Sequence, residues 1–198
     1  MSRNAWAVVV LVACLGASWW LLTGRDGTAR RHRRDLADEL AAWVVRETVA
    51  GGTGALLILA PPAEAGDPFP GHLGDRLQAR ARAAGFSPIT LQHVPCDPAL
   101  ESTGEPITRD TFLGLLRDHA DAEVVISLVG VPRLVAADRP AAGRPRLIVA
   151  STVLMPYLKE LPAGLLDFAI EFRRDQVPGT LDPALGELGN YFILTRPR

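Results

Sequence analysis

The pattern of apolar and polar positions after residue 54 alternates between two periods. Short apolar runs, such as ALLILA at 55–60 and EVVISLVGV at 123–131, are typical of strands buried on both faces of a sheet. Between such runs, stretches such as 73–84 place apolar residues at a helical spacing and end at a glycine. The order predicts an α/β domain with a single, mostly parallel sheet and helices on both faces.

Six strands and four helices are expected from this pattern, with the last strand at an edge of the sheet. The expected strands are 55–60, 88–94, 123–131, 146–152, 168–173 and 191–195. The expected helices are 29–50, 73–84, 109–120 and a short one at 155–161. Thr108 has a side chain suited to cap the third of these helices.

The order of these elements over residues 55–173 carries a family resemblance. ALLILA, a helix, PITLQHV, a helix, EVVISLVGV, RLIVAST, a short helix and GLLDFAIEFR follow one another. This succession resembles one lobe of a type 1 periplasmic-binding-protein fold, a family with two lobes around a ligand cleft. The chain has room for one lobe. The resemblance implies a Rossmann-like fold and a ligand-recognition ancestry, and it assigns no site residue.

An uncharged run, AWAVVVLVACLGASWWLL, occupies residues 5–22. As a helix it would be about 27 Å long, close to the ~30 Å hydrocarbon core of a bilayer. Tryptophans stand near its ends and an arginine follows it, which is the arrangement of membrane-interface residues. The sequence therefore predicts a single-pass transmembrane helix as an N-terminal anchor over residues 1–24. The residues expected at the membrane surface are Trp6, Trp19, Trp20 and Arg25.

Two alternatives to this anchor stay open. Leu11-Val12-Ala13-Cys14 resembles a bacterial lipobox, which would attach a lipid to Cys14. A cleaved signal peptide is the second alternative. The apolar run continues for eight residues past Cys14 and ends in bulky residues, whereas cleavage sites carry small ones. The anchor is therefore the favoured prediction.

The orientation of the anchor follows from charge. Five arginines lie within 25–34, after the span, and only Arg3 and the amino group precede it. Positive charges prefer the cytoplasm, which favours a cytoplasmic domain. A signal anchor of the exporting kind would place the domain outside the cytoplasm, and this alternative stays open.

Charge and composition narrow the class of protein. Residues 1–34 carry a formal charge of +5, so the remainder carries −6 out of the total of −1. An acidic domain lacks the clustered cations that nucleic-acid binding needs, so no nucleic-acid partner is expected. With 48% apolar and 22% charged residues the chain is globular, and its two cysteines exclude a disulfide scaffold. Lys159 is the single lysine against 20 arginines, which is typical of a GC-rich bacterial genome.

The chain is expected to have three parts. The anchor over 1–24 is followed by a basic segment and an amphipathic helix over 25–54, and the α/β domain occupies 55–198. No phosphate-binding loop of the GxxxxGK[ST] kind and no GxSxG motif is present in the sequence. The sequence therefore assigns no catalytic residue, no metal ligand and no cofactor.

Candidate ligand-binding residues follow from the rule that parallel sheets bind ligands outside the carboxyl ends of their strands. The polar residues in the segments after these strand ends are Glu64, Asp67, Arg133, Arg139, Ser151 and Thr152. The arginines suit a bidentate anion, or are solvated loop residues. The two hydroxyls contact a ligand or cap the helix at 155–161. The two acids form an acid/base pair or serve ordinary turns.

Three functions are compatible with these features. The first is a non-catalytic, membrane-anchored α/β module that acts as an accessory or scaffold subunit of a membrane assembly, through a protein partner. The second is a small-molecule-binding module of the periplasmic-binding-protein kind. The third, less favoured, is a hydrolase or transferase on the same sheet.

Overall fold

A computed structural model describes residues 32–49, 52–62, 68–95, 105, 107–138, 145–151, 155–172, 185, 188 and 191–196. The chain divides into two compact units, Met1–Leu36 and Ala37–Arg198. The fold described below is that of the second unit. The expected divisions after residues 24 and 54 stay predictions.

The predicted anchor lies outside the described residues, together with Cys14, Trp6, Trp19, Trp20 and Arg25. Within the described part of the chain, no helix combines the length and the apolar character needed to cross a membrane.

One six-stranded sheet forms the centre of the second unit, in the order β2-β1-β3-β4-β5-β6. The strands are β1 (Leu56–Ala60), β2 (Ile89–His93), β3 (Val124–Ser127), β4 (Arg146–Ser151), β5 (Phe168–Phe172) and β6 (Phe192–Thr195). The first five strands are parallel to one another, and β6 pairs antiparallel with β5. The predicted six-stranded, mostly parallel sheet with its last strand at an edge is confirmed.

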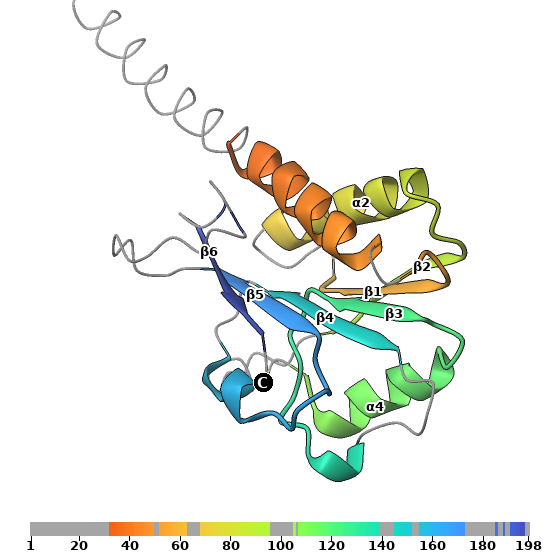
Figure 1. Cartoon of the computed structure of the whole chain (residues 1–198), viewed down its shortest axis with the longest axis vertical. Helices are drawn as coiled ribbons and strands as arrows, with labels where there is room; N and C mark the ends of the chain where they lie inside the picture. Colours follow the sequence, from red (N-terminus) through yellow and green to blue (C-terminus); the bar gives the residue numbers. More distant parts are fainter. Residues whose placement is uncertain are drawn as a thin grey trace, which may run out of the picture. The chain divides into compact units, whose positions relative to one another are not determined.

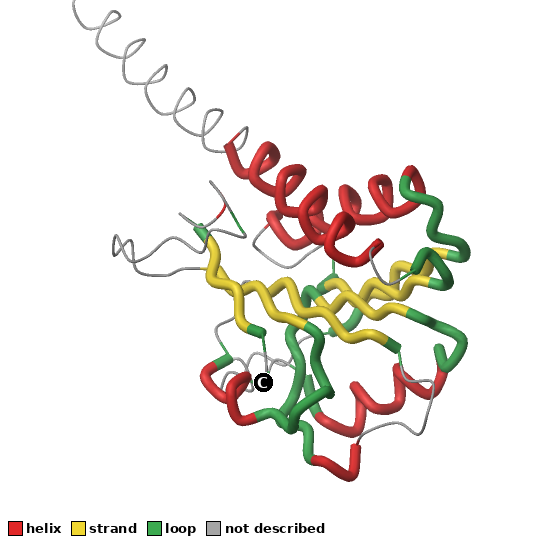
Figure 2. The backbone as a smooth tube through the Cα atoms, in the orientation of Figure 1, coloured by secondary structure: helices red, strands yellow, loops and turns green. Residues whose placement is uncertain are grey.

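Helices cover both faces of this sheet (Figures 1 and 2). Residues 37–49, part of a helix over 32–49, lie on one face beside α2 (Pro68–Ala83). The other face carries α4 (Arg109–Asp118) and two short 3₁₀ helices, η1 (Ala136–Asp138) and η2 (Pro156–Glu160). This confirms helices on both faces, as right-handed crossovers between parallel strands require.

The two faces have separate apolar cores, because side chains alternate along each strand. Leu57, Val125 and Leu147 pack with residues of α4 and η2 in one buried cluster. On the opposite face, Trp43 meets the Phe168 ring edge-on, with ring centroids 5.5 Å apart. Both faces of the central strands β1, β3 and β4 are thus closed off from water, which explains their continuous apolar runs in the sequence.

Two element boundaries differ from the prediction by four residues or more. Strand β3 ends at Ser127 and not at residue 131, because the Ser127 hydroxyl donates to the Gly130 carbonyl and closes a turn. Gly130 has φ of +81°, a conformation that favours glycine. Helix α2 begins at Pro68 and not at residue 73. Proline is tolerated in the first helical turn, where its missing N–H has no helical partner to lose.

The buried position of Ile148 gives a test of this fold. Ile148 lies in β4 between β3 and β5 and is 0% exposed. In Ile148→Asp the unpaired carboxylate costs several kcal/mol, a large part of the ~5–15 kcal/mol of a typical domain. We expect loss of cooperative urea unfolding monitored by circular dichroism. The matched control is Ile193→Asp on β6, where the native side chain is 39% exposed. Equal effects of both substitutions would contradict the assignment of β4 to the sheet centre.

Candidate functional site at the carboxyl edge of the sheet

The topology singles out one place along the carboxyl edge of the sheet. Strands β1 and β3 are parallel neighbours. The connection after β1 leads to α2 on one face, whereas the connection after β3 leads to η1 on the other (Figure 1). Open parallel sheets bind ligands outside the strand ends where neighbouring connections diverge in this way. The candidate site therefore lies beyond Ala60 and Ser127.

Buried polar side chains mark the same edge. Of the residues that the structure describes, Thr48, Ser127, Ser151 and Glu171 are the buried polar or charged ones. Ser127 and Ser151 end β3 and β4, and Glu171 is the penultimate residue of β5, opposite Ser151 in register. Alternation along the strands places these three side chains on the face that carries η2. Buried polar side chains thus lie at the carboxyl ends of three adjacent strands, β3, β4 and β5.

Glu171 fixes the segment that precedes η2. Its Oε1 atom accepts a hydrogen bond of 2.7 Å from the Met155 backbone N–H, and the residue is 7% exposed. Burial raises the pKa of Glu171, while the bond from Met155 and the charge of Lys159 oppose this shift. Met155 is the N-cap residue of η2, and its own side chain makes no capping hydrogen bond. Ser151 belongs to β4, and Thr152 lies outside the described residues, so the expectation that these hydroxyls cap the helix stays a prediction.

The loop after β3 is tied to η2 through both backbone polar groups of Val131. The Val131 N–H donates to the Met155 sulfur at 3.4 Å, and the Tyr157 hydroxyl donates to the Val131 carbonyl. Tyr157 is 1% exposed, and burial raises the pKa of its phenol. These two bonds constrain the loop two residues before Arg133.

Arg133 lies in the same loop, and its side chain is exposed to solvent. Its guanidinium carbon lies 5.2 Å from the centroid of the Tyr157 ring, and its Nε atom lies 3.1 Å from Glu105 Oε1. The Arg133 side chain remains 63% exposed. A cation over an aromatic face and beside a carboxylate has fewer orientations available than an isolated surface arginine.

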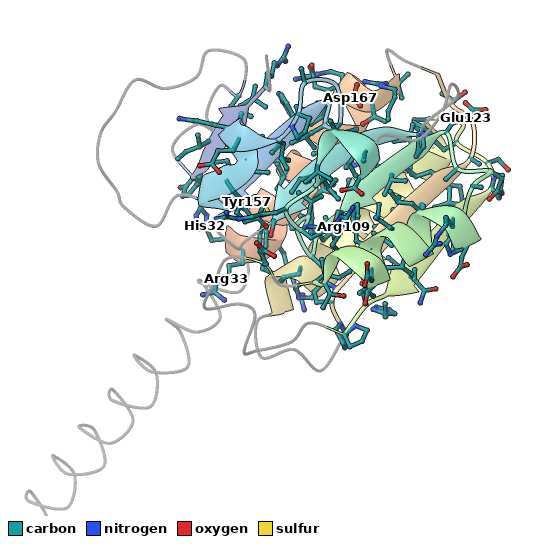
Figure 3. All side chains as sticks on the ribbon, turned by 90° about the horizontal axis from the view of Figure 1, so that it is seen from below. His32, Arg33, Arg109, Glu123, Tyr157 and Asp167 are labelled. Atoms are coloured by element: carbon teal, nitrogen blue, oxygen red, sulfur yellow. The ribbon has the colours of Figure 1, made fainter. Side chains whose placement is uncertain are left out.

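A second arginine, Arg109, forms an ion pair that joins α4 to η1. Arg109, at the start of α4, donates from Nε to Asp138 Oδ2 at 2.8 Å and from Nη2 to Asp138 Oδ1. Asp138 Oδ2 also accepts the Val135 N–H at 2.7 Å. These bonds lower the pKa of Asp138 and raise that of Arg109. Figure 3 shows Arg109 and Tyr157 toward one end of the strands and Glu123 and Asp167 toward the other.

Of the six candidate ligand residues, the structure describes Arg133 and Ser151. Both lie at the carboxyl edge, Arg133 exposed in the loop after β3 and Ser151 3% exposed at the end of β4. The other four, Glu64, Asp67, Arg139 and Thr152, lie outside the described residues.

Sequence reasoning did not single out Glu105, Tyr157 and Glu171. The available signal was Glu171, a lone carboxylate inside the otherwise apolar run FAIEF. A charged residue in a strand buried on both faces requires a partner, and here that partner is a backbone amide.

The fold and the site define a three-layer α/β protein with a polar carboxyl edge. No family model and no curated protein matches the sequence. Solved structures with a similar course of the backbone include a periplasmic ribose ABC transporter protein from Conexibacter woesei. It is 16% identical, with a TM-score of 0.49, over 78% of this chain and 47% of that one.

Two further structures have the same kind of likeness. A sugar ABC substrate-binding protein from Bordetella parapertussis is 22% identical, with a TM-score of 0.43, over 68% of this chain and 41% of its own. An ABC transporter substrate-binding protein from Desulfitobacterium hafniense is 13% identical, with a TM-score of 0.32, over 79% and 41%. The chain spans less than half of each protein. These likenesses concern the course of the backbone alone.

The pair of Arg109 and Asp138 predicts how stability depends on pH. Because the folded-state pKa of Asp138 is lowered, its stabilising contribution is present above about pH 3.9 and is lost as pH falls through the folded-state value. Asp138→Asn should therefore lower Tm most at pH 7, and the difference from wild type should shrink toward acid. Asp75→Asn, on the exposed side of α2, is the control. A difference that stays constant between pH 7 and pH 2 would show that the charge of Asp138 is not the cause.

Proposed function

We propose that the protein binds a small polar molecule at the carboxyl edge of the sheet, between the segments that follow β1 and β3. The observation that carries this proposal is Arg133, an exposed guanidinium held over the buried Tyr157 ring at the divergence of two connections. Support of this kind reduces the ordering cost of binding, because the donor does not have to be immobilised by the ligand.

Guanidinium chemistry indicates the kind of ligand. The group presents planar N–H pairs that match ligand oxygens, whether carboxylate, phosphate or hydroxyl. The sequence puts Glu64 and Asp67 in the segment after β1 and Arg139 in the segment after β3. Together with Ser151, the last residue of β4, and Thr152, which follows it, these residues are proposed as further ligand contacts.

A thermal-shift screen tests this proposal on the wild-type protein. A ligand at roughly 100 times its Kd stabilises the folded state by about 2.7 kcal/mol. The library should include pentoses and hexoses, since two of the similar structures are named for ribose and for sugar. Stabilisation by none of the compounds would count against a small-molecule function.

Arg133→Ala tests the site itself. We expect the substitution to weaken the ligand found in the screen at least about tenfold, or ~1.4 kcal/mol, as measured by calorimetry. The matched control is Arg82→Ala, because Arg82 is an exposed arginine on α2, on the opposite face of the sheet from η2. Ligand binding that is equal in Arg133→Ala and wild type would place the ligand elsewhere.

We also propose that residues 1–24 hold the chain at a membrane, with the domain in the cytoplasm. The positive charges after the span support this orientation. A role as an accessory subunit of a membrane assembly depends on this segment, and crosslinking in native membranes tests it by capturing a defined partner.

Protease accessibility of a C-terminal tag in spheroplasts tests the orientation. We expect the tag to be protected in intact spheroplasts and digested after lysis. Digestion in intact spheroplasts would put the domain on the outer side of the membrane and would direct the ligand screen to extracellular compounds.

A further inference from the structure

A continuous series of contacts links the end of β5 to Arg133. The Glu171 carboxylate binds the Met155 N–H, and the Met155 sulfur accepts the Val131 N–H. The Val131 carbonyl accepts the Tyr157 hydroxyl, and the Tyr157 ring carries the Arg133 guanidinium. Glu171 is the charged residue at the buried end of this series.

We propose that Glu171 is a positioning residue: its carboxylate holds Met155 and Tyr157 so that Arg133 points toward the ligand. This inference rests on the proposed function only in treating Arg133 as a ligand contact. The series of contacts from Glu171 to Arg133 does not depend on a ligand.

Burying a carboxylate to accept a hydrogen bond from one backbone amide has a large desolvation cost. A serine or asparagine oxygen accepts the same bond at a lower desolvation cost. The carboxylate gives a stronger acceptor in return, because charge-assisted hydrogen bonds are about twice as strong as neutral ones. The strength of the link therefore depends on the charge of Glu171, and burial already favours its neutral form.

The described neighbours of Glu171 contribute one opposing charge. From η2, Lys159 stabilises the carboxylate, and the Tyr157 phenol is neutral over the same pH range. In register, Ser151 of β4 and Ile193 of β6 flank Glu171, and neither is charged. Acidification should thus protonate Glu171 above the ordinary glutamate value of about 4.3, weaken the bond to Met155 and loosen the support of Arg133.

Methionine-methyl NMR on the full-length protein tests the link directly. The chain contains two methionines, Met1 and Met155. With methyl-labelled methionine, Met155 gives one signal next to Glu171, assigned by Met155→Leu. We expect this signal to titrate with a midpoint above about pH 4.3 in wild type and to lose the titration in Glu171→Gln, which keeps an acceptor but removes the charge. A signal that does not titrate, or that titrates equally in Glu171→Gln, overturns the proposal.

The Arg133 Nε–H resonance reports the far end of the series. In wild type the Tyr157 ring current displaces it from the value of a free arginine. In Glu171→Ala we expect it to move to the free value. In Glu171→Gln, which keeps the acceptor without the charge, we expect a value between those of wild type and Glu171→Ala. Glu160→Ala, on the exposed end of η2, should change neither resonance. If Glu171→Ala does not fold, the Glu171→Gln titration decides. If Glu171→Ala folds and its Arg133 resonance is unchanged, Glu171 does not position Arg133. If both resonances respond as expected but the protein binds no ligand, only the proposed function is refuted.

Discussion

A parallel sheet must be covered on both faces, because each of its strands buries side chains in both directions. In this protein that requirement fixes the position of nearly every other element. Right-handed crossovers bring α2 and α4 to opposite faces, and the amphipathic stretch 37–49 completes the first layer beside α2. Both crossover helices then begin at the carboxyl edge, so the loops that carry polar residues gather there.

Covering the faces leaves the strand ends as the place where polar groups enter the interior. Buried polar atoms need partners, and here they find them in the loops that follow the strands. Ser127 bonds the Gly130 carbonyl, and Glu171 bonds the Met155 amide. The loop that carries Arg133 is therefore shaped by hydrogen bonds from the sheet itself. A rigid scaffold that positions an exposed loop residue is the usual relation between fold and binding site.

The sheet was predictable from the sequence because strands buried on both faces form continuous apolar runs. The end of β3 was not, since SLVG reads as strand until the Ser127 hydroxyl is seen to close a turn. The early start of α2 was missed because its prolines resemble a loop. In the structure Phe69, in the first turn of α2, packs on Phe192 of β6, with ring centroids 6.4 Å apart. This contact joins residues far apart in the sequence, so a local pattern does not reveal it.

The candidate site was predictable to the extent that it depends on strand order. Arg133 follows an apolar run, and the carboxyl end of a parallel strand is where a ligand is expected. The roles of Glu171 and Tyr157 depend on which loop packs against them, and hydropathy contains no such information. Ser151 lies within the predicted strand 146–152, but the pattern did not show that its side chain would be buried, at 3% exposure.

The single lysine of the chain has a practical consequence for chemistry on this protein. Lys159 lies exposed on η2, two residues after Tyr157 and within electrostatic reach of Glu171. Reagents that acylate amines therefore have one side-chain target in 198 residues, and it borders the carboxyl edge. A dye or affinity tag attached there is delivered to a defined position on η2, within electrostatic reach of Glu171, without any engineered cysteine.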